Sequence, residues 1–280
     1  MSAPALRLVP PDPAAAIFDD WEMFGLAAGW APKTISMRRL CVRQLARHAG
    51  VRPEDVTTRQ VAYWLATFTA PATRASYYRS ARAFYTWLVA TGQRVDNPTG
   101  ALPRPREPRH VPRPVRTADL ARALEGVRTG RAYAYIVLGA YAGLRVHEIA
   151  KVRGDDVDVV EKTLHVVGKG AVEASLPMHP RLVRLAHGMC DDGWWFPSGS
   201  ASGHVGAATV SQTIQLAFAR VDVKMTAHQL RHWYGTQILR AAGGNLRVAQ
   251  ECLRHASPAT TAQYTLVEDV ERRRAVDKLV

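Results

Sequence analysis

The C-terminal part of the chain contains the stretch Leu253-Arg254-His255-Ala256-Ser257-Pro258, which is followed by Thr260-Thr261-Ala262-Gln263-Tyr264. Ser257 and Pro258 form a typical helix start, an N-cap residue followed by proline, so Tyr264 is predicted to lie on a helix. His255 lies nine positions before Tyr264 and 24 positions after Arg231. The stretch predicts a helical C-terminal region in which a histidine and a tyrosine follow each other closely.

Two earlier segments hold the residue types that would complete a polar site with this stretch. They read Ala142-Gly143-Leu144-Arg145-Val146-His147-Glu148 and Ala227-His228-Gln229-Leu230-Arg231-His232. Thr226 and Gln229 form a capping-box pattern, which predicts a helix that carries His228 and Arg231 on one face. Taken singly, the second segment is better explained by a surface pair and the first by an ion pair within one helix. The combination of all three segments is what points to a shared site.

Composition indicates a globular protein with a polyanionic partner. Hydrophobic residues make up 47% of the chain and charged residues 22%, which is globular composition. No apolar run approaches the ~20 residues of a membrane span, and the N-terminus lacks the apolar core of a signal peptide. The three cysteines are widely spaced, so we expect neither a disulfide framework nor a zinc site, and a reducing cytoplasm fits. The net charge of +13 favours nucleic acid, although a merely soluble basic protein would show the same charge.

The spacing of apolar residues predicts a mainly α protein with a small antiparallel β-sheet and two domains. Residues 1–17 are rich in Ala and Pro and are predicted to be a flexible tail. A helical domain is expected over 18–98, and a Pro/Arg-rich linker over 99–116, because proline prevents helix formation. The second domain is predicted over 117–280, with a buried helix over Ala132–Tyr141. Its strands are expected at Val157–Val160, Thr163–Val167 and Ala174–Met178, with helices in the remainder.

Considered together, these segments resemble the tyrosine recombinase, or phage integrase, family. In that family one site is formed by an arginine in an A-G-L-R-x-x-E-like segment, a lysine in a G-K-G hairpin, an H-x-L-R-H helix, a later histidine and a tyrosine nine residues on. All these pieces occur here in that order, over residues 117–270. The first part of the chain agrees only in being a small helical domain of the length of the family's core-binding domain.

The resemblance implies that the matched residues hold and attack a DNA phosphate. Arg145 and Arg231 would bind its non-bridging oxygens through bidentate hydrogen bonds, and His255 would donate a further one. Tyr264 would attack phosphorus and form a 3′-phosphotyrosyl intermediate. That intermediate conserves the energy of the broken bond, so the resemblance implies strand joining without cofactor, ATP or metal ion.

The resemblance also implies the proton transfers of the reaction. His228 would accept the proton of the tyrosine, and Lys169 would protonate the departing 5′ oxygen. Glu148 would orient the basic residues without reacting.

Three positions depart from the commonest pattern of the family. Arg254 stands where glycine often precedes the histidine, and Gln229 replaces a frequent aspartate. The basic residue that usually follows the hairpin lysine is missing, and Glu173 and Ala174 stand there instead. None of these departures removes a reacting group, but Arg254 is expected to alter how the tyrosine helix approaches the site.

The expected partner is double-stranded DNA, held by a C-shaped clamp of the two domains, with four protomers assembled on two duplexes in a bacterial host cytoplasm, at the nucleoid. Residues 1–116 hold 17 Lys and Arg against 8 Asp and Glu, and surface solubility explains this excess as well as DNA contacts do. The candidate DNA contacts are Arg38, Arg39, Arg43, Arg79, Arg82, Arg104 and Arg106. The C-terminal helix over 267–280 would dock on a neighbouring protomer, as in the family, or on its own domain. The sequence leaves open whether an accessory factor sets the direction of recombination. No membrane partner is expected.

The first 17 residues leave no room for a domain that binds distant arm-type sites, so a two-domain enzyme for phage or mobile-element integration and excision is predicted. The alternatives are a Xer-like resolvase of replicon dimers, a DNA-relaxing enzyme similar to type IB topoisomerases, and a DNA-binding protein of the same fold that does not cut. Intact Arg145, Arg231 and Tyr264 argue against the last, because binding alone needs no tyrosine at that position.

Overall fold

The computed structural model describes residues 15–106, 113–127, 130–168 and 173–254. The chain divides into two compact units, 1–109 and 110–280, and each has its own hydrophobic core. The boundary between the units falls within the stretch 99–116, which the sequence predicts to be a linker. Within the described ranges, no helix is both long enough and apolar enough to cross a membrane.

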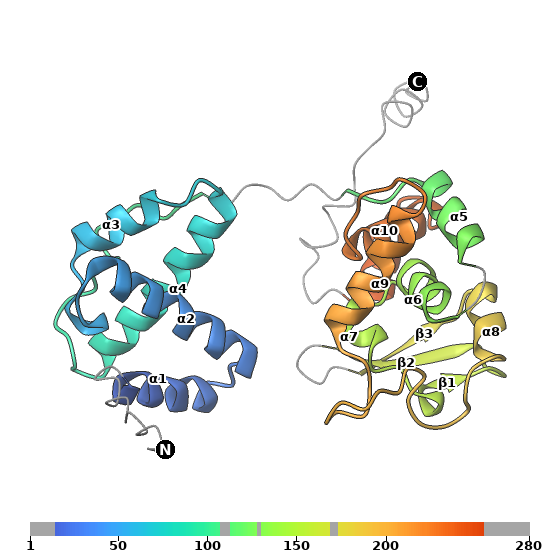
Figure 1. Ribbon diagram of the computed structural model, residues 1–280, viewed down its shortest axis with the longest axis horizontal. Coiled ribbons are helices and arrows are strands. Elements are labelled where there is room, and N and C mark those ends of the chain that lie inside the picture. The colour runs from blue at the N-terminus through green and yellow to red at the C-terminus, as the bar shows by residue number, and fades with distance from the viewer. Residues whose placement is uncertain (1–14, 107–112, 128–129, 169–172, 255–280) are drawn as a thin grey trace, which may run out of the picture. The chain divides into compact units, whose positions relative to one another are not determined.

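The first unit is built from helices (Figure 1), and these pack around a core rich in aromatic residues. Phe18 and Trp21 of its first helix pack on Phe84, with ring centroids 5.9 and 4.9 Å apart. This helix begins at Ala15, inside the stretch predicted to be a flexible tail. The N-cap of the third helix is Thr57, which forms a reciprocal capping box with Gln60. The elements are α1 (Ala15–Ala27), α2 (Pro32–Ala49), the 3-10 turn η1 (Pro53–Asp55), α3 (Thr58–Ala66) and α4 (Pro71–Ala90).

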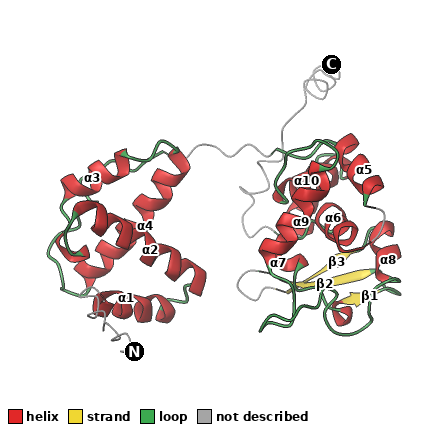
Figure 2. Cartoon of the chain, in the orientation of Figure 1, coloured by secondary structure: helices red, strands yellow, loops and turns green. Residues whose placement is uncertain are grey.

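The second unit is organised around helix α6, which is buried along most of its length. Residues 134–140 are buried, as the apolar run predicts, and α8, α9 and α10 pack against this helix. Figure 2 shows helices along one side of the unit and the three strands along the other. The helices are α5 (Thr117–Gly126), α6 (Gly130–Tyr141), α7 (Val146–Ile149), α8 (Pro180–Ala186), α9 (Ala207–Ala219), α10 (His228–Ala241) and α11 (Leu246–Leu253), with the 3-10 turn η2 (Gly154–Asp156).

The small sheet is antiparallel, with strand order β1-β2-β3. Its strands are β1 (Val157–Asp158), β2 (Thr163–Val167) and β3 (Glu173–Pro177). Leu164 and Leu176 pair across β2 and β3 and both are buried, because alternate side chains of a strand face the core. The prediction of a mainly α protein with a small antiparallel sheet is confirmed.

The first strand is shorter than the predicted span of Val157–Val160. The carboxylate of Asp158 accepts a hydrogen bond from the backbone N–H of Glu161 at 2.8 Å, which starts a turn directly after the strand. Lys162 then adopts a positive φ of 53°. The valines at 159 and 160 therefore belong to this turn, although their side chains favour a strand.

Candidate active site

The segment that carries Arg145 is a turn between α6 and the short helix α7. Gly143 makes this turn with a φ of +63°, and a Cβ at this position would lie 2.4 Å from the ring of Tyr234. Arg145 is the residue before α7, and its backbone N–H donates to the carboxylate of Glu148 at 2.7 Å. The Nη1 of Arg145 donates to the same carboxylate at 3.1 Å. The ion pair expected from the three-residue spacing therefore forms, and it holds Arg145 at the start of α7.

Glu148 is the centre of the polar cluster. Its side chain is 1% exposed. A second arginine, Arg254, donates hydrogen bonds from Nη1 and Nη2 to the two carboxylate oxygens, at 3.2 and 2.9 Å. Burial acts to raise the pKa of Glu148. The hydrogen bonds and charge of Arg254, together with the backbone N–H and guanidinium of Arg145, outweigh burial and hold this pKa below its usual value. Glu148 is therefore a carboxylate that orients two arginines.

Arg231 is the most buried arginine of the cluster, with 1% of its surface exposed. It lies on α10, and its two Nη atoms donate to the backbone carbonyls of Gly143 and Leu253. One guanidinium thus connects the turn before Arg145 to the last residue of α11. Gly143 lies 88 positions from Arg231 in the sequence and Leu253 lies 22 positions from it, and both contact this one side chain.

The two histidines of α10 lie one turn apart. Their rings meet edge to face, with centroids 4.4 Å apart. His228 is exposed at the first turn of the helix, whereas His232 is 4% exposed. Of the predicted capping box, the side chain of Gln229 accepts from the backbone N–H of Thr226 at 2.8 Å, which is one half of the reciprocal pair.

A hollow of about 580 Å³ opens beside Arg145. One third of the Arg145 side chain is exposed, so its guanidinium can be reached from solvent. His147 and Glu148 line one part of the hollow, and His165 and Gly168 of the hairpin line another. Gly168 is the residue before Lys169, which lies outside the described residues together with His255 and Tyr264.

Of the residues predicted for the catalytic site, the structure therefore describes Arg145, Glu148, His228 and Arg231. It brings Arg145, Glu148 and the carbonyl contacts of Arg231 into one cluster. The sequence reasoning missed the part that Arg254 takes in this cluster. The signal for this role was that Arg254 stands where the family often has glycine. Its backbone adopts φ 53° and ψ 48°, a left-handed conformation that glycine favours. Across the described ranges, no group of three or more His, Cys, Asp or Glu side chains is placed to hold a metal ion.

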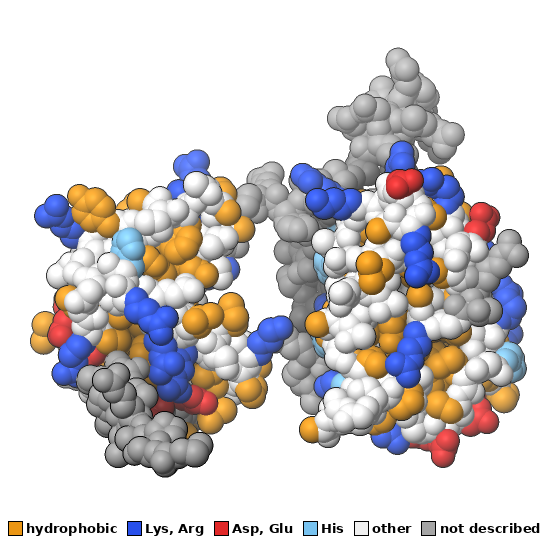
Figure 3. Space-filling view, in the orientation of Figure 1, with side chains coloured by type: hydrophobic (Ala, Val, Ile, Leu, Met, Phe, Trp, Pro, Cys, Tyr) orange, Lys and Arg blue, Asp and Glu red, His pale blue; other side chains and the backbone are white. Residues whose placement is uncertain are grey.

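The candidate DNA contacts of the first unit differ in how accessible they are. Arg39 pairs with Asp19 and Glu22 of α1, at 3.1 and 2.8 Å, so its charge is already offset. The guanidinium of Arg38 lies 3.9 Å from the ring centroid of Trp30, a cation–π contact. Figure 3 shows basic side chains among hydrophobic ones on the viewed face of this unit. Arg38, Arg39 and Arg43 are partly buried, and Arg79, Arg82, Arg104 and Arg106 are exposed.

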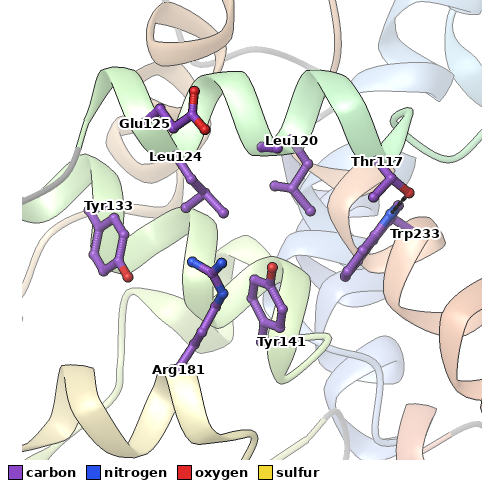
Figure 4. Close-up of a pocket in the computed structure, with 9 residues that line it drawn as sticks. Thr117, Leu120, Leu124, Glu125, Tyr133, Tyr141, Arg181 and Trp233 are labelled. Atoms are coloured by element: carbon purple, nitrogen blue, oxygen red, sulfur yellow. Dashed lines mark hydrogen bonds between the residues drawn. The ribbon is translucent and has the colours of Figure 1, made fainter.

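A separate hollow of about 430 Å³ lies between α5, α6, α8 and α10. Figure 4 shows Tyr141 and Trp233 facing it, with Leu120 and Leu124 of α5 on the opposite side. The indole N–H of Trp233 donates to the hydroxyl of Thr117 at 3.0 Å. None of the predicted site residues lines this hollow, so it is distinct from the candidate active site.

Comparison with known proteins gives relatives along most of the chain. It is 30% identical over 209 residues to the tyrosine recombinase XerD of Rhizobium meliloti (strain 1021), an alignment that covers 66% of this chain and 67% of that protein. It is 40% identical to the structure of the integrase from mycobacterium phage Brujita, which covers 95% of this chain and 92% of that one with a TM-score of 0.50.

The fold is shared with more distant structures as well. A lambda integrase (75–356) dimer bound to a COC′ core site aligns with a TM-score of 0.72 at 17% identity, over 88% of this chain and 96% of that one. Residues 117–271, more than half of the chain, match the Phage integrase family. The chain therefore belongs to the phage integrase family of tyrosine recombinases, which are site-specific DNA strand-transfer enzymes.

Proposed function

We propose that this recombinase cuts and rejoins DNA through a covalent bond between Tyr264 and a 3′ phosphate. The observation that supports this most directly is the contact of Arg231 with both Gly143 and Leu253. It joins the segment of Arg145 to the end of α11, one residue before Arg254 and two before His255. This contact between the segment of Arg145, helix α10 and the end of α11 supports the proposal of a single phosphate-binding site.

In the proposed reaction the arginines stabilise the charge that develops on the phosphate. Arg145 lines the hollow with a partly exposed guanidinium and would contact a non-bridging oxygen. Arg231 adds positive charge from a buried position, and we expect DNA binding to exchange one of its carbonyl bonds for a phosphate oxygen. Preorganised donors of this kind are typically worth about 10²–10³ in rate each.

The remaining steps are proton transfers. A free phenol has a pKa of about 10, so Tyr264 needs a base, for which we propose His228, exposed at the first turn of α10. His255 would donate a further hydrogen bond to the phosphate, and Lys169 would protonate the 5′ oxygen that leaves. Because the phosphotyrosine bond retains the energy of the cleaved bond, rejoining would need neither ATP nor a metal ion.

For the biological role, we propose integration and excision of a phage or mobile element. The 40% identity to the integrase from mycobacterium phage Brujita, over 95% of this chain, favours this role. The relatives named XerC and XerD, at about 30% identity, favour resolution of replicon dimers as the second candidate. A lambda integrase tetramer is known bound to a Holliday junction, which supports a tetramer on DNA here. Residues 267–280, which lie outside the described residues, would dock on a neighbouring protomer. We further propose that an accessory factor sets the direction of recombination. The enzyme would act at the nucleoid, in a bacterial host cytoplasm.

Covalent trapping tests the chemistry. The protein is incubated in EDTA and without ATP with nicked or 5′-phosphorothiolate duplexes that tile the DNA bordering its gene. We expect an adduct that survives denaturation with the wild type, and none with Tyr264→Phe, because the nucleophilic oxygen is gone. Tyr133→Phe, which removes a hydroxyl from the second hollow, serves as the matched control and should form the adduct normally.

The remaining outcomes decide between the alternatives. An adduct that persists in Tyr264→Phe would assign the nucleophile to another residue. Specific binding of one duplex without any adduct would favour a DNA-binding protein that does not cut. An adduct that forms only when Mg²⁺ is supplied would contradict the metal-independent mechanism.

A further inference from the structure

Arg254 has a backbone conformation that does not suit its side chain. It caps α11 in the left-handed region, with φ 53° and ψ 48°, where a Cβ crowds the following carbonyl and glycine is preferred. Only Lys162 and Asp222 share a positive φ among the described residues other than glycine. Such a conformation costs free energy and persists only where the surrounding contacts hold it, so the contacts of the Arg254 side chain are of interest.

The side chain of Arg254 makes a two-bond contact that links distant parts of the chain. It reaches Glu148, 106 positions earlier, with both Nη atoms. The two side chains are 9% and 1% exposed, so the pair is shielded from solvent. Glu148 in turn accepts from the backbone N–H and the guanidinium of Arg145. A continuous chain of charged hydrogen bonds therefore runs from the end of α11 to Arg145.

A second connection joins the same two segments. Arg231 donates to the carbonyls of Gly143 and Leu253, which lie two positions before Arg145 and one position before Arg254. The end of α11 is thus attached to the Arg145 segment by two arginines from different elements. The next residue along the chain is His255.

We propose that Arg254 is a positioning residue of the cleavage site: its ion pair with Glu148 fixes the end of α11, which precedes His255 in the sequence, relative to Arg145. This inference rests on the proposed function, because it presumes that Arg145 and His255 act on one phosphate. Arg254 itself touches no DNA in this scheme and acts through Glu148. A displacement of about 1 Å between such groups typically lowers the rate about 100-fold.

Removing Arg254 also changes the titration of Glu148. The charged groups that face this carboxylate are Arg254 from the end of α11 and Arg145 from its own segment, with His147 adjacent. Without Arg254, burial raises the pKa of Glu148 against Arg145 alone. As the pH falls through this raised pKa, Glu148 takes up a proton and its hold on Arg145 weakens. In the wild type Arg254 keeps the pKa of Glu148 low, so Glu148 should add no pH dependence of its own over the same range.

Three substitutions separate the charge of Arg254 from its backbone conformation. Arg254→Met removes the charge and keeps the strained backbone conformation. Arg254→Gly removes the charge and also relieves the strain. Arg254→Lys keeps the charge but cannot form both hydrogen bonds to Glu148. The rate of adduct formation is measured on the trapping duplex at saturating protein, over about pH 5.5–8.5. We expect the Arg254→Met and Arg254→Gly variants to form the adduct about 10- to 100-fold more slowly than the wild type. This difference should grow as the pH falls. The rate of Arg254→Lys should lie between those of these variants and the wild type.

Controls distinguish positioning from loss of folding. Arg247→Met removes the exposed pair with Glu251 from the same helix and should leave the rate and its pH profile unchanged. Thermal unfolding and DNA affinity are measured for every variant, and the assay is run below each unfolding transition. If Arg254 acts through Glu148, the double variant Arg254→Met, Glu148→Gln should be no slower than the slower single variant.

The failure of this inference can be told from the failure of the proposed function. The positioning role alone would be overturned if the wild type forms the adduct and the Met and Gly variants react at the wild-type rate with the wild-type pH profile. Additive losses in the double variant would also overturn it. Specific binding without a wild-type adduct would overturn the proposed function, and this inference with it.

Discussion

At the scale of single residues, the active-site turn depends on a glycine that has no substitute. Gly143 has a φ of +63° and its missing Cβ would overlap the ring of Tyr234, which is itself buried. Its carbonyl accepts from Arg231. Any larger residue must therefore both adopt a left-handed backbone and displace an aromatic ring next to the buried arginine.

We expect Gly143→Ala to lower the free energy of unfolding by about 2 kcal/mol or more, from the left-handed backbone and the overpacking together. Denaturant unfolding measures this. Gly126→Ala is the matched control, because nothing lies within 4 Å of the added Cβ and its φ is not positive. It should be neutral or slightly stabilising. Equal stabilities of the two variants would contradict the packing of Tyr234 on this turn.

The same scale shows what the sequence could predict of the site. Arg145 and Glu148 lie three positions apart, so their ion pair follows from helical spacing alone. The pairing of Glu148 with Arg254 spans 106 positions, and no local pattern encodes it. It depends on how α7, α10 and α11 pack, which becomes known only with the tertiary structure. The sequence marked Arg254 as unusual, but it did not reveal the residue it contacts.

At the scale of elements, helix α11 is short and depends on its ends. It has eight residues, fewer than an isolated helix needs to be stable in water. The side chain of Asn245 accepts from the backbone N–H groups of Arg247 and Val248 at 3.0 and 3.4 Å. Arg254 closes the other end. The position of the end of α11 therefore depends on two capping residues as well as on packing.

Asn245→Ala is expected to cost about 1 kcal/mol of stability and to slow adduct formation, because the end of α11 becomes less fixed. Thr57→Ala removes the corresponding cap from α3 in the first unit and should cost a similar amount without slowing adduct formation at saturating DNA. Thermal unfolding and trapping on the same preparations compare the two. Equal rates would show that the order of α11 is not needed for cleavage.

Most elements were predictable because their patterns are local. The apolar run over Ala132–Tyr141 indicates a buried helix, and α6 covers it. The hairpin strands follow from alternating residues on either side of a glycine pair. The first strand was predicted too long, because the turn set by Asp158 and Glu161 overrides the strand preference of two valines.

At the scale of the whole molecule, the two units have separate cores, and the described part of the stretch between them is exposed at Arg104 and Arg106. We expect limited trypsin digestion to cut first after Arg106 or Arg109, since Arg104 and Arg113 are each followed by proline and resist cleavage. Two fragments, identified by mass spectrometry, should then persist.

Substituting Gln for both Arg106 and Arg109 should delay this first cut, which provides the control. Early cuts within 15–90 or 117–254 would contradict the division into two stable units. The sequence indicated the division through its prolines. It could not fix the boundary, because proline content marks where helices cannot form and not where the packing of each core ends.

The three cysteines described by the structure differ in a way that bears on chemical labelling. Burial raises the pKa of Cys41 to about 12, and burial also raises that of Cys252, whereas Cys190 is exposed. Thiol reagents react with a cysteine in its thiolate form, and only where its sulfur is accessible. The chain thus carries one natural attachment point for a fluorophore, in its second unit, so the number of protomers bound to one DNA molecule can be measured without engineering a new site.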